Sequence, residues 1–218
     1  MRQYSGRDFA VKNIRVFYQK TGRLKYISHL DMNRVFTRIS RRSGMPIWYT
    51  EGFNPHPRIN FALPLSLGFE STYEAVDIRI DDDNYSNDEA FERLKAVMPD
   101  ELKVVKVADP VMKTGDIAFA RFEISLDLPD DADAFFEQGE IFMEKKTKKG
   151  GVKTVDIRPM INSYEISGNK LTLVLSAGTD NLNPSLVIDA MRRHFDREIK
   201  VNSVTRTMLY NKEMEKFI

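Results

Sequence analysis

Residues 14–107 alternate between two hydrophobic periods in a fixed order, and this order limits the fold more than any other feature of the sequence. A period of two residues is typical of a half-buried strand, and a period of 3.6 residues is typical of an amphipathic helix. The strand patterns lie at about 14–19, 47–50, 76–80 and 103–107, and the helical patterns lie at 28–43 and 86–98. The resulting order, β-α-β-β-α-β, is that of a ferredoxin-like unit.

Both predicted helices have local start signals, and the first also has a stop signal. Ser28 and Ser86 are suitable N-cap residues, each followed three positions later by an acidic residue, as in a capping box. The sequence Gly44-Met45-Pro46 ends the first helix. Helical spacing directs four side chains of the first helix toward the core, namely Met32, Val35, Phe36 and Ile39.

The second half of the chain repeats this order loosely. A strand at 122–128 and a short helix at 131–138 precede a hairpin, whose tip has the sequence KKTKKGG. A second hairpin at 161–175, a helix opened by Asn183-Pro184 and a last strand at 203–209 follow. The predicted fold class is therefore α+β, with two packed ferredoxin-like units at 1–112 and 113–218. The second unit carries the extra hairpin.

Composition excludes several classes of site. The 218 residues include no cysteine, which rules out disulfides, thiolate zinc sites, cysteine nucleophiles and iron–sulfur clusters held by cysteine. No glycine-rich phosphate loop, serine-hydrolase elbow or zinc-protease motif is present, and no cofactor is predicted. The longest uncharged apolar run is 59–69, far short of the about 20 residues that a membrane span needs. We expect a cytoplasmic protein without membrane contact.

Charge is distributed unevenly along the chain, although the formal net charge is only +1. Residues 1–64 hold 12 Lys/Arg and 3 Asp/Glu, whereas residues 65–128 hold 7 and 15. A segment of +9 favours an anionic partner. Alternatively, the acidic segment of −8 covers or neutralises the basic one within the fold.

The first predicted helix carries the clearest basic feature. At 100° per residue, four arginines share one arc apart from the apolar face, namely Arg34, Arg38, Arg41 and Arg42. Guanidinium groups bind phosphates and carboxylates with two hydrogen bonds each, so this face is a candidate anion reader. An ordinary solvated helix face is the alternative, and Asp31 lies in the same arc.

A loop with the sequence EGFNPHPR follows at 51–58. Prolines on both sides of His56 restrict the backbone, so the imidazole is presented with little conformational freedom. We expect Phe53 either to stack on a base or to be buried, and Asn54 and Arg58 are further candidate contacts with a nucleic acid. A purely structural turn is the alternative reading.

Two of the three histidines, His29 and His56, lie in the basic segment. They are candidates for general acid–base groups in RNA cleavage, with Asp31 beside them. They are weak candidates for metal ligands, since a third ligand such as Asp31 or Glu51 would be needed and no tight spacing is present. A structural role, capping the helix and bracing the loop, is the interpretation that we favour.

The lysine-rich hairpin tip is the third candidate surface. Lys148 and Lys149 are suited to contact a phosphate backbone, and Arg158 continues from this tip along the chain. A solvated tip that protects the hairpin from aggregation is the alternative.

Three motifs carry a resemblance to a known family, namely KTGRLKYISHLD at 20–31, RRSGMP at 41–46 and EGFNPHP at 51–57. Gly68, Ser71, Gly150-Gly151 and the segment 156–159 fit the same pattern. With these motifs, most of the chain resembles a bacterial radical-SAM-associated domain family of unknown function. In that family the domain occurs alone or fused behind a cobalamin-binding radical SAM protein.

The resemblance implies a partner and no reaction. Radical SAM enzymes hold their cluster with cysteines, so this chain is not itself such an enzyme. We expect an accessory protein that presents RNA or another anionic substrate to a cobalamin-binding radical SAM protein. The alternatives are a small RNA-processing or metal-dependent enzyme that uses His29 and His56, and a protein-interaction scaffold.

Overall fold

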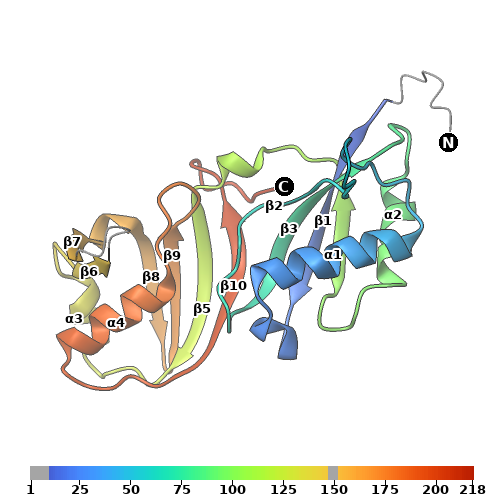
Figure 1. Cartoon of the computed structure of the whole chain (residues 1–218). Helices are drawn as coiled ribbons and strands as arrows, with labels where there is room; N and C mark the ends of the chain where they lie inside the picture. Colours follow the sequence, from blue (N-terminus) through green and yellow to red (C-terminus); the bar gives the residue numbers. More distant parts are fainter. Residues whose placement is uncertain (1–9, 147–151) are drawn as a thin grey trace. The chain divides into compact units, whose positions relative to one another are not determined.

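The computed structural model describes residues 10–146 and 152–218 and has a mixed α+β fold with four α-helices in the described residues (Figure 1). The chain divides into two compact units. Unit 1 contains the described residues up to Thr114 together with Ile218, and unit 2 contains Gly115–Phe217. In the described part of the chain, no helix combines the length and the apolar character that crossing a membrane requires.

Unit 1 is an antiparallel sheet with two helices. Its strands have the spatial order β4-β1-β3, with β2 paired to the other edge of β3, and each of these pairs is antiparallel. The elements are β1 (Lys12–Lys20), the 3-10 helix η1 (Gly22–Tyr26), α1 (His29–Ser43), β2 (Ile59–Phe61), β3 (Glu70–Ile80), α2 (Asn87–Lys95) and β4 (Val104–Ala108).

The core of unit 1 lies between this sheet and its helices. Alternate residues of β1 and β3 point to the helices, and α1 contributes the side chains that periodicity predicted, with Val35 half-buried and the others buried. The buried side chains form one cluster with those of α2, including Ile14, Val16, Phe36, Ile78 and Leu94. Each fully buried aliphatic or aromatic side chain contributes about 1.5–3 kcal/mol relative to an exposed one.

Local signals fix both ends of α1, as predicted. The Ser28 hydroxyl accepts a hydrogen bond from the backbone N–H of Asp31 (3.1 Å) and donates to the Asp31 carboxylate (2.7 Å). At the other end, Gly44 adopts a left-handed conformation with φ of 68°. The guanidinium of Arg93, on α2, donates to the carbonyl of Gly44 (2.9 Å) and supplies a partner that the helix end lacks.

The prediction of a strand at 47–50 is wrong. In the described structure Ile47 forms only an isolated bridge with Ile80, and the edge of β3 pairs instead with β2, which the sequence patterns did not indicate. Between these two pairings the chain leaves the sheet after Trp48, which donates to the carbonyl of Arg79, and returns at Arg58, whose carbonyl accepts from the N–H of Arg79. Ile47 and Trp48, which belong to the apolar alternation at 47–50, join the base of this projecting segment to β3.

The sheet of unit 2 has the spatial order β10-β5-β9-β8, and its pairs are also antiparallel. As in unit 1, the last strand of the sheet in the sequence lies beside the first, and the third lies between the first and the second. The predicted hairpin is confirmed as a separate two-stranded sheet of β6 and β7. The elements are β5 (Phe119–Leu126), α3 (Ala132–Phe136), β6 (Phe142–Lys146), β7 (Val152–Asp156), the 3-10 helix η3 (Arg158–Met160), β8 (Ile161–Ser167), β9 (Lys170–Ser176), α4 (Pro184–His194) and β10 (Val201–Tyr210). A short 3-10 helix, η2 (Thr114–Asp116), lies where the sequence passes from one unit to the other.

Candidate functional site

The four arginines of α1 are all exposed to solvent. Arg34 forms an ion pair with Asp31 (2.9 Å) on the same helix. Within residues 10–146 and 152–218, no carboxylate pairs with Arg38, Arg41 or Arg42. We call these three residues the arginine face. It presents three guanidiniums whose donors are available to a ligand.

The acidic segment does not neutralise the arginine face. Four of its carboxylates pair instead with basic residues of β1 and η1, at N–O distances from 2.7 to 3.7 Å, and Glu89, Glu92 and Glu123 pair with other cations. The four ion pairs with β1 and η1 are Lys12–Asp109, Arg15–Asp77, Arg23–Glu101 and Lys25–Glu70. The basic excess of the first 64 residues is therefore partly cancelled inside unit 1 and partly left exposed on α1.

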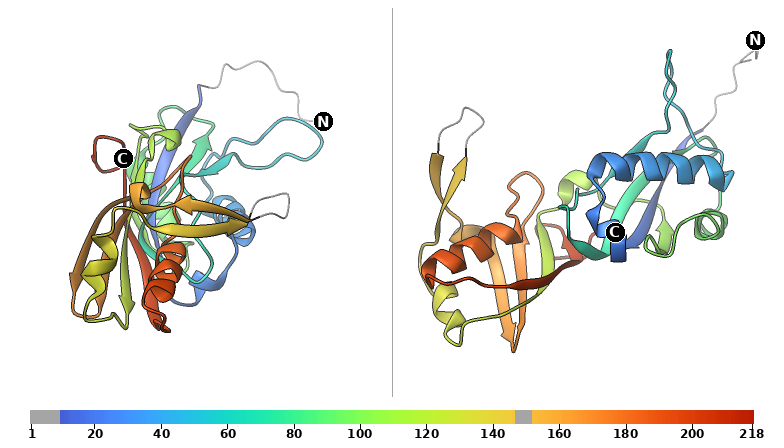
Figure 2. Two further views of the ribbon diagram at one scale, coloured as in Figure 1. Left: turned by 90° about the vertical axis from the view of Figure 1, so that its left-hand side faces the viewer. Right: turned by 60° about the horizontal axis from the view of Figure 1, so that its bottom comes forward.

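Residues 48–58 form a projecting arm. Tyr49 bridges to Pro57, and the backbone N–H of Thr50 donates to the carbonyl of His56 (2.9 Å). Both views of Figure 2 show the arm extending from unit 1 on the same side of the sheet as α1. Phe53, near the tip, has a relative exposure of 106%, so the arm presents a complete aromatic face to solvent.

His56 braces the arm from within. Its backbone N–H donates to the Thr50 hydroxyl (3.2 Å), and its Nδ1 lies 3.1 Å from that hydroxyl and 3.2 Å from the carbonyl oxygen of Asn54. A carbonyl oxygen only accepts, so the tautomer that fits this contact carries its proton on Nδ1.

His29 has different surroundings, at the first position of α1. Its Nε2 lies 3.2 Å from the amide nitrogen of Asn33, and its ring meets Phe61 edge-on with centroids 5.2 Å apart. Asp31 is held by its local partners, since the hydrogen bond from Ser28 and then the contact with Arg34 lower the pKa of this carboxyl. His29 and Asp31 thus have structural partners in α1 and β2.

A small cavity beside His29, with a mostly apolar lining, was not anticipated from the sequence. Its lining includes Lys20 and Glu74, which are only 2% and 4% exposed. The free space is about 10 Å³, room for about one water molecule. These residues continue the core-facing alternation of β1 and β3, Ile14-Val16-Tyr18-Lys20 and Ile80-Ile78-Val76-Glu74, so parity in the strands was the signal that could have found them.

The structure does not bring His29 and His56 into contact. His29 packs on Phe61, which pairs with Val76 of β3, whereas the arm begins where Trp48 donates to the carbonyl of Arg79. Three strand residues separate these points by about 10 Å, and His56 lies farther out along the arm. Across the described ranges, no cluster of three or more His, Asp or Glu side chains is arranged to hold a metal ion.

The remaining candidates lie elsewhere. Arg58 stands at the base of the arm and lines a pocket with Asn13 and Asp77, on the face of the unit 1 sheet opposite α1. Arg158 is half-buried in unit 2, where its guanidinium donates to the carbonyl of Ile161 (3.2 Å). Lys148 and Lys149 lie outside the described residues.

Comparison with known proteins gives a family and one structural likeness. No curated protein matches the chain. Among solved structures, the chain is similar to one chain of "Crystal Structure of a Cbf5-Nop10-Gar1 Complex", with 12% sequence identity and a TM-score of 0.48. The match covers 90% of this chain and 48% of that chain, so the protein spans about half the length of its structural relative. A family model matches residues 13–204, and the chain therefore belongs to the family described as "Uncharacterized protein conserved in bacteria (DUF2344)".

Proposed function

We propose that the protein binds RNA through the arginine face of α1 and the tip of the arm. The observation that carries this proposal is the arginine face itself, three exposed guanidiniums without a carboxylate partner in the described structure. Phosphate contacts by Arg supply most of the affinity in nucleic-acid binding. An exposed aromatic ring beside such a surface adds base stacking.

The arginine face is not needed to cap its own helix. Arginines in the last turn of a helix commonly interact with the terminal carbonyls. In α1 that position is taken by Arg93 of α2, which donates to the carbonyls of Gly44 (2.9 Å) and Ser43 (3.4 Å). The guanidinium groups of Arg41 and Arg42 are therefore exposed to solvent and available to a ligand, which supports a role in binding.

The exposed aromatic ring on the arm indicates that the ligand is single-stranded RNA and not a duplex. Phe53 can stack only on a base whose face is accessible, and the bases of single-stranded segments are those that proteins read in this way. The internal hydrogen bonds between Thr50 and His56 hold the arm in one conformation before binding. A pre-ordered arm loses less conformational entropy when it binds.

The test is a fluorescence anisotropy titration of the full chain against a labelled single-stranded RNA of mixed sequence, at several salt concentrations. The variant R38A/R41A/R42A should bind more weakly, and its plot of log K against log salt should be shallower by about 2, since each lost phosphate contact removes about 0.7. A matched control, R193A/R197A/K200A, removes three exposed cations from unit 2 and should leave the slope unchanged.

Two results would contradict the proposal. One is the absence of RNA binding by the wild-type chain at low salt. The other is an equal loss of affinity in both triple variants, which would indicate attraction by total charge. If RNA does not bind but a protein partner is retained through the arginine face after nuclease treatment, the scaffold interpretation replaces the RNA interpretation.

The finer fold and partner assignments belong to the same proposal. We propose that each unit is ferredoxin-like, because both share the strand order in which the first and third strands are central. We also propose, from the family resemblance, that the protein serves a cobalamin-binding radical SAM protein. Co-purification of that protein with the chain, measured with and without nuclease, tests this partnership and shows whether RNA bridges the two.

A further inference from the structure

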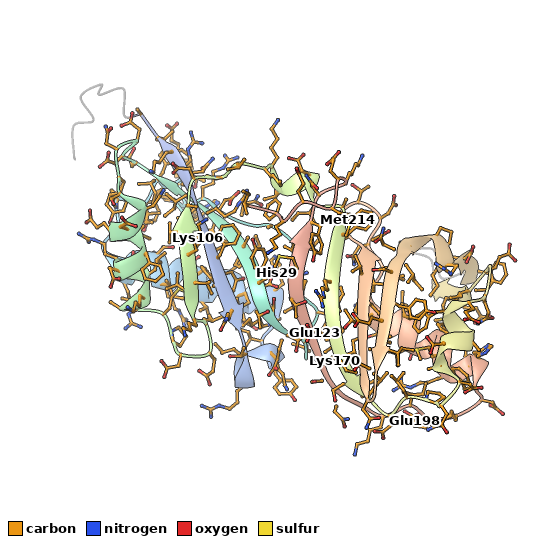
Figure 3. All side chains as sticks on the ribbon, turned by 180° about the vertical axis from the view of Figure 1, so that it is seen from behind. His29, Lys106, Glu123, Lys170, Glu198 and Met214 are labelled. Carbon is orange, nitrogen blue, oxygen red and sulfur yellow. The ribbon has the colours of Figure 1, made fainter. Side chains whose placement is uncertain are left out.

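The face of the unit 1 sheet opposite α1 and α2, here called the back face, carries an ordered set of polar side chains. Strand register places them in two rows across β2, β3 and β1. The first row is Arg58, Arg79 and Asn13, and the second is Asn60, Asp77 and Arg15. Figure 3 views the structure from this side, with Lys106 of β4 labelled.

Asp77 is fixed at the centre of the second row. Arg15, which is 1% exposed, donates to both carboxylate oxygens, with Nε 2.7 Å from Oδ1 and Nη2 2.9 Å from Oδ2. Arg15 also donates to the backbone oxygen of Ile218 (2.9 Å). A carboxylate has about four acceptor sites, so Asp77 retains one on each oxygen after binding Arg15.

A pocket of about 290 Å³ opens in front of these rows, lined by Asn13, Arg58, Ile59, Asn60 and Asp77. This volume is at the lower end of the range for small-molecule sites. It suits one planar heterocycle with its attached phosphate and is too small for several. Ile59 pairs with Ile78 and its side chain packs against the core on the α1 side of the sheet, so the polar side chains of the other four lining residues supply the chemistry of the pocket.

The chemistry of the lining separates donors from acceptors. The Asn60 amide nitrogen donates to the Thr114 hydroxyl (3.4 Å), which orients its carbonyl oxygen as an acceptor beside Asp77. The guanidinium of Arg79 stacks on Trp48 at 4.7 Å, so it is already engaged. Arg58 has no side-chain partner in the part of the chain that the structure describes, and it is the cation available to a phosphate.

We propose that this pocket binds one nucleotide of the RNA and selects a base that carries an exocyclic amino group. The amino group donates to Asp77 and Asn60, and Arg58 contacts the phosphate. Uracil, which presents a carbonyl at the same position, would set an acceptor against a carboxylate. The inference deepens the proposed function, since the nucleotide is one unit of the bound strand.

The test compares cytidine and uridine monophosphates, which differ at C4, an amino group against a carbonyl, and at N3, an acceptor nitrogen against an N–H. Binding to the full chain is followed by NMR chemical shifts. CMP should bind at least about tenfold more tightly than UMP, the lower part of the range for one specific base contact. N60A should reduce this preference, whereas R58A should weaken both nucleotides by a similar factor because it removes the phosphate contact.

Controls separate this inference from the proposed function. N181A, an exposed asparagine in unit 2, should leave both nucleotide affinities unchanged. R38A/R41A/R42A should keep the preference for CMP while it loses RNA affinity. Equal binding of CMP and UMP, no detectable binding of either, or an unchanged preference in N60A would each overturn the nucleotide pocket and leave RNA binding by α1 standing. Selective CMP binding without RNA binding would support the nucleotide pocket and overturn RNA binding by α1.

Discussion

Replacement of Phe53 by alanine should separate RNA binding from folding stability. The ring is 106% exposed, so its removal takes no apolar surface out of a core. We expect the free energy of unfolding to change by less than about 0.5 kcal/mol, as for other surface substitutions. Stacking of a base on an aromatic side chain contributes about 1–3 kcal/mol, so RNA affinity should fall by about 5- to 150-fold.

A buried ring, that of Phe36, shows how large the loss of folding stability would be if Phe53 belonged to the core. Phe36 is 0% exposed and packs between Tyr18 and Phe61, with ring centroids 4.9 and 5.2 Å away. F36A should lower the free energy of unfolding by about 3–5 kcal/mol. Urea denaturation of F53A and F36A beside the wild-type chain measures both effects.

The binding arm of this experiment uses the same RNA titration with one further control. Phe142 is 55% exposed on β6 of unit 2, and F142A should leave the RNA affinity unchanged. A folded F53A variant that binds RNA as tightly as the wild-type chain would refute stacking by the arm. An equal loss in F142A would show that the decrease reflects general surface hydrophobicity.

Three further substitutions test the packing and the electrostatics. S40A should raise the free energy of unfolding by about 1 kcal/mol in a urea titration, because the buried Ser40 hydroxyl has no hydrogen-bond partner among the described residues. G178A should lower the melting temperature clearly, since Gly178 has φ of 79° and a Cβ would clash with the backbone carbonyl oxygen of Ile117. An unchanged melting temperature would contradict this geometry. Hydrogen bonds from Asn87 and Lys12 lower the pKa of Asp109. The ionised form is thus favoured in the folded state, and its contribution is present above pH about 4 and is lost as the pH falls through the lowered value. D109N should therefore lose less stability on acidification than the wild-type chain, and identical acid profiles would count against that ion pair.

Local signals in the sequence were sufficient to predict where α1 begins and ends. They were misleading at the edge of β3, where they indicated a strand at 47–50 instead of β2. Ser28 and Gly44 determine where α1 begins and ends through contacts within a few residues, and such contacts can be read from sequence. The pairing of Ile59–Phe61 with β3 joins segments that are far apart in the sequence, so local signals do not determine it. The alternation at 47–50 fits a strand equally well, and only the tertiary structure decides between the two.

In the candidate site, too, some features follow from the local sequence and others depend on tertiary structure. The exposure of the four α1 arginines follows from helical periodicity, so the sequence predicts it. Strand alternation places Lys20 and Glu74 on the core-facing side of the sheet, but their near-complete burial depends on the elements that cover the end of the sheet. The separation of Arg58 from the α1 arginines likewise follows from strand register, which places it on the back face.

The arm also carries a built-in spectroscopic reporter. Trp48 is the single tryptophan in the 218 residues, and it lies half-buried at the base of the arm, stacked against the Arg79 guanidinium. Its emission therefore comes from one place, between the projecting segment and the back face of the unit 1 sheet. Because the chain has no cysteine, one introduced thiol can carry an acceptor dye at a chosen position. Energy transfer from Trp48 to that dye would then follow the arm in solution without any other label.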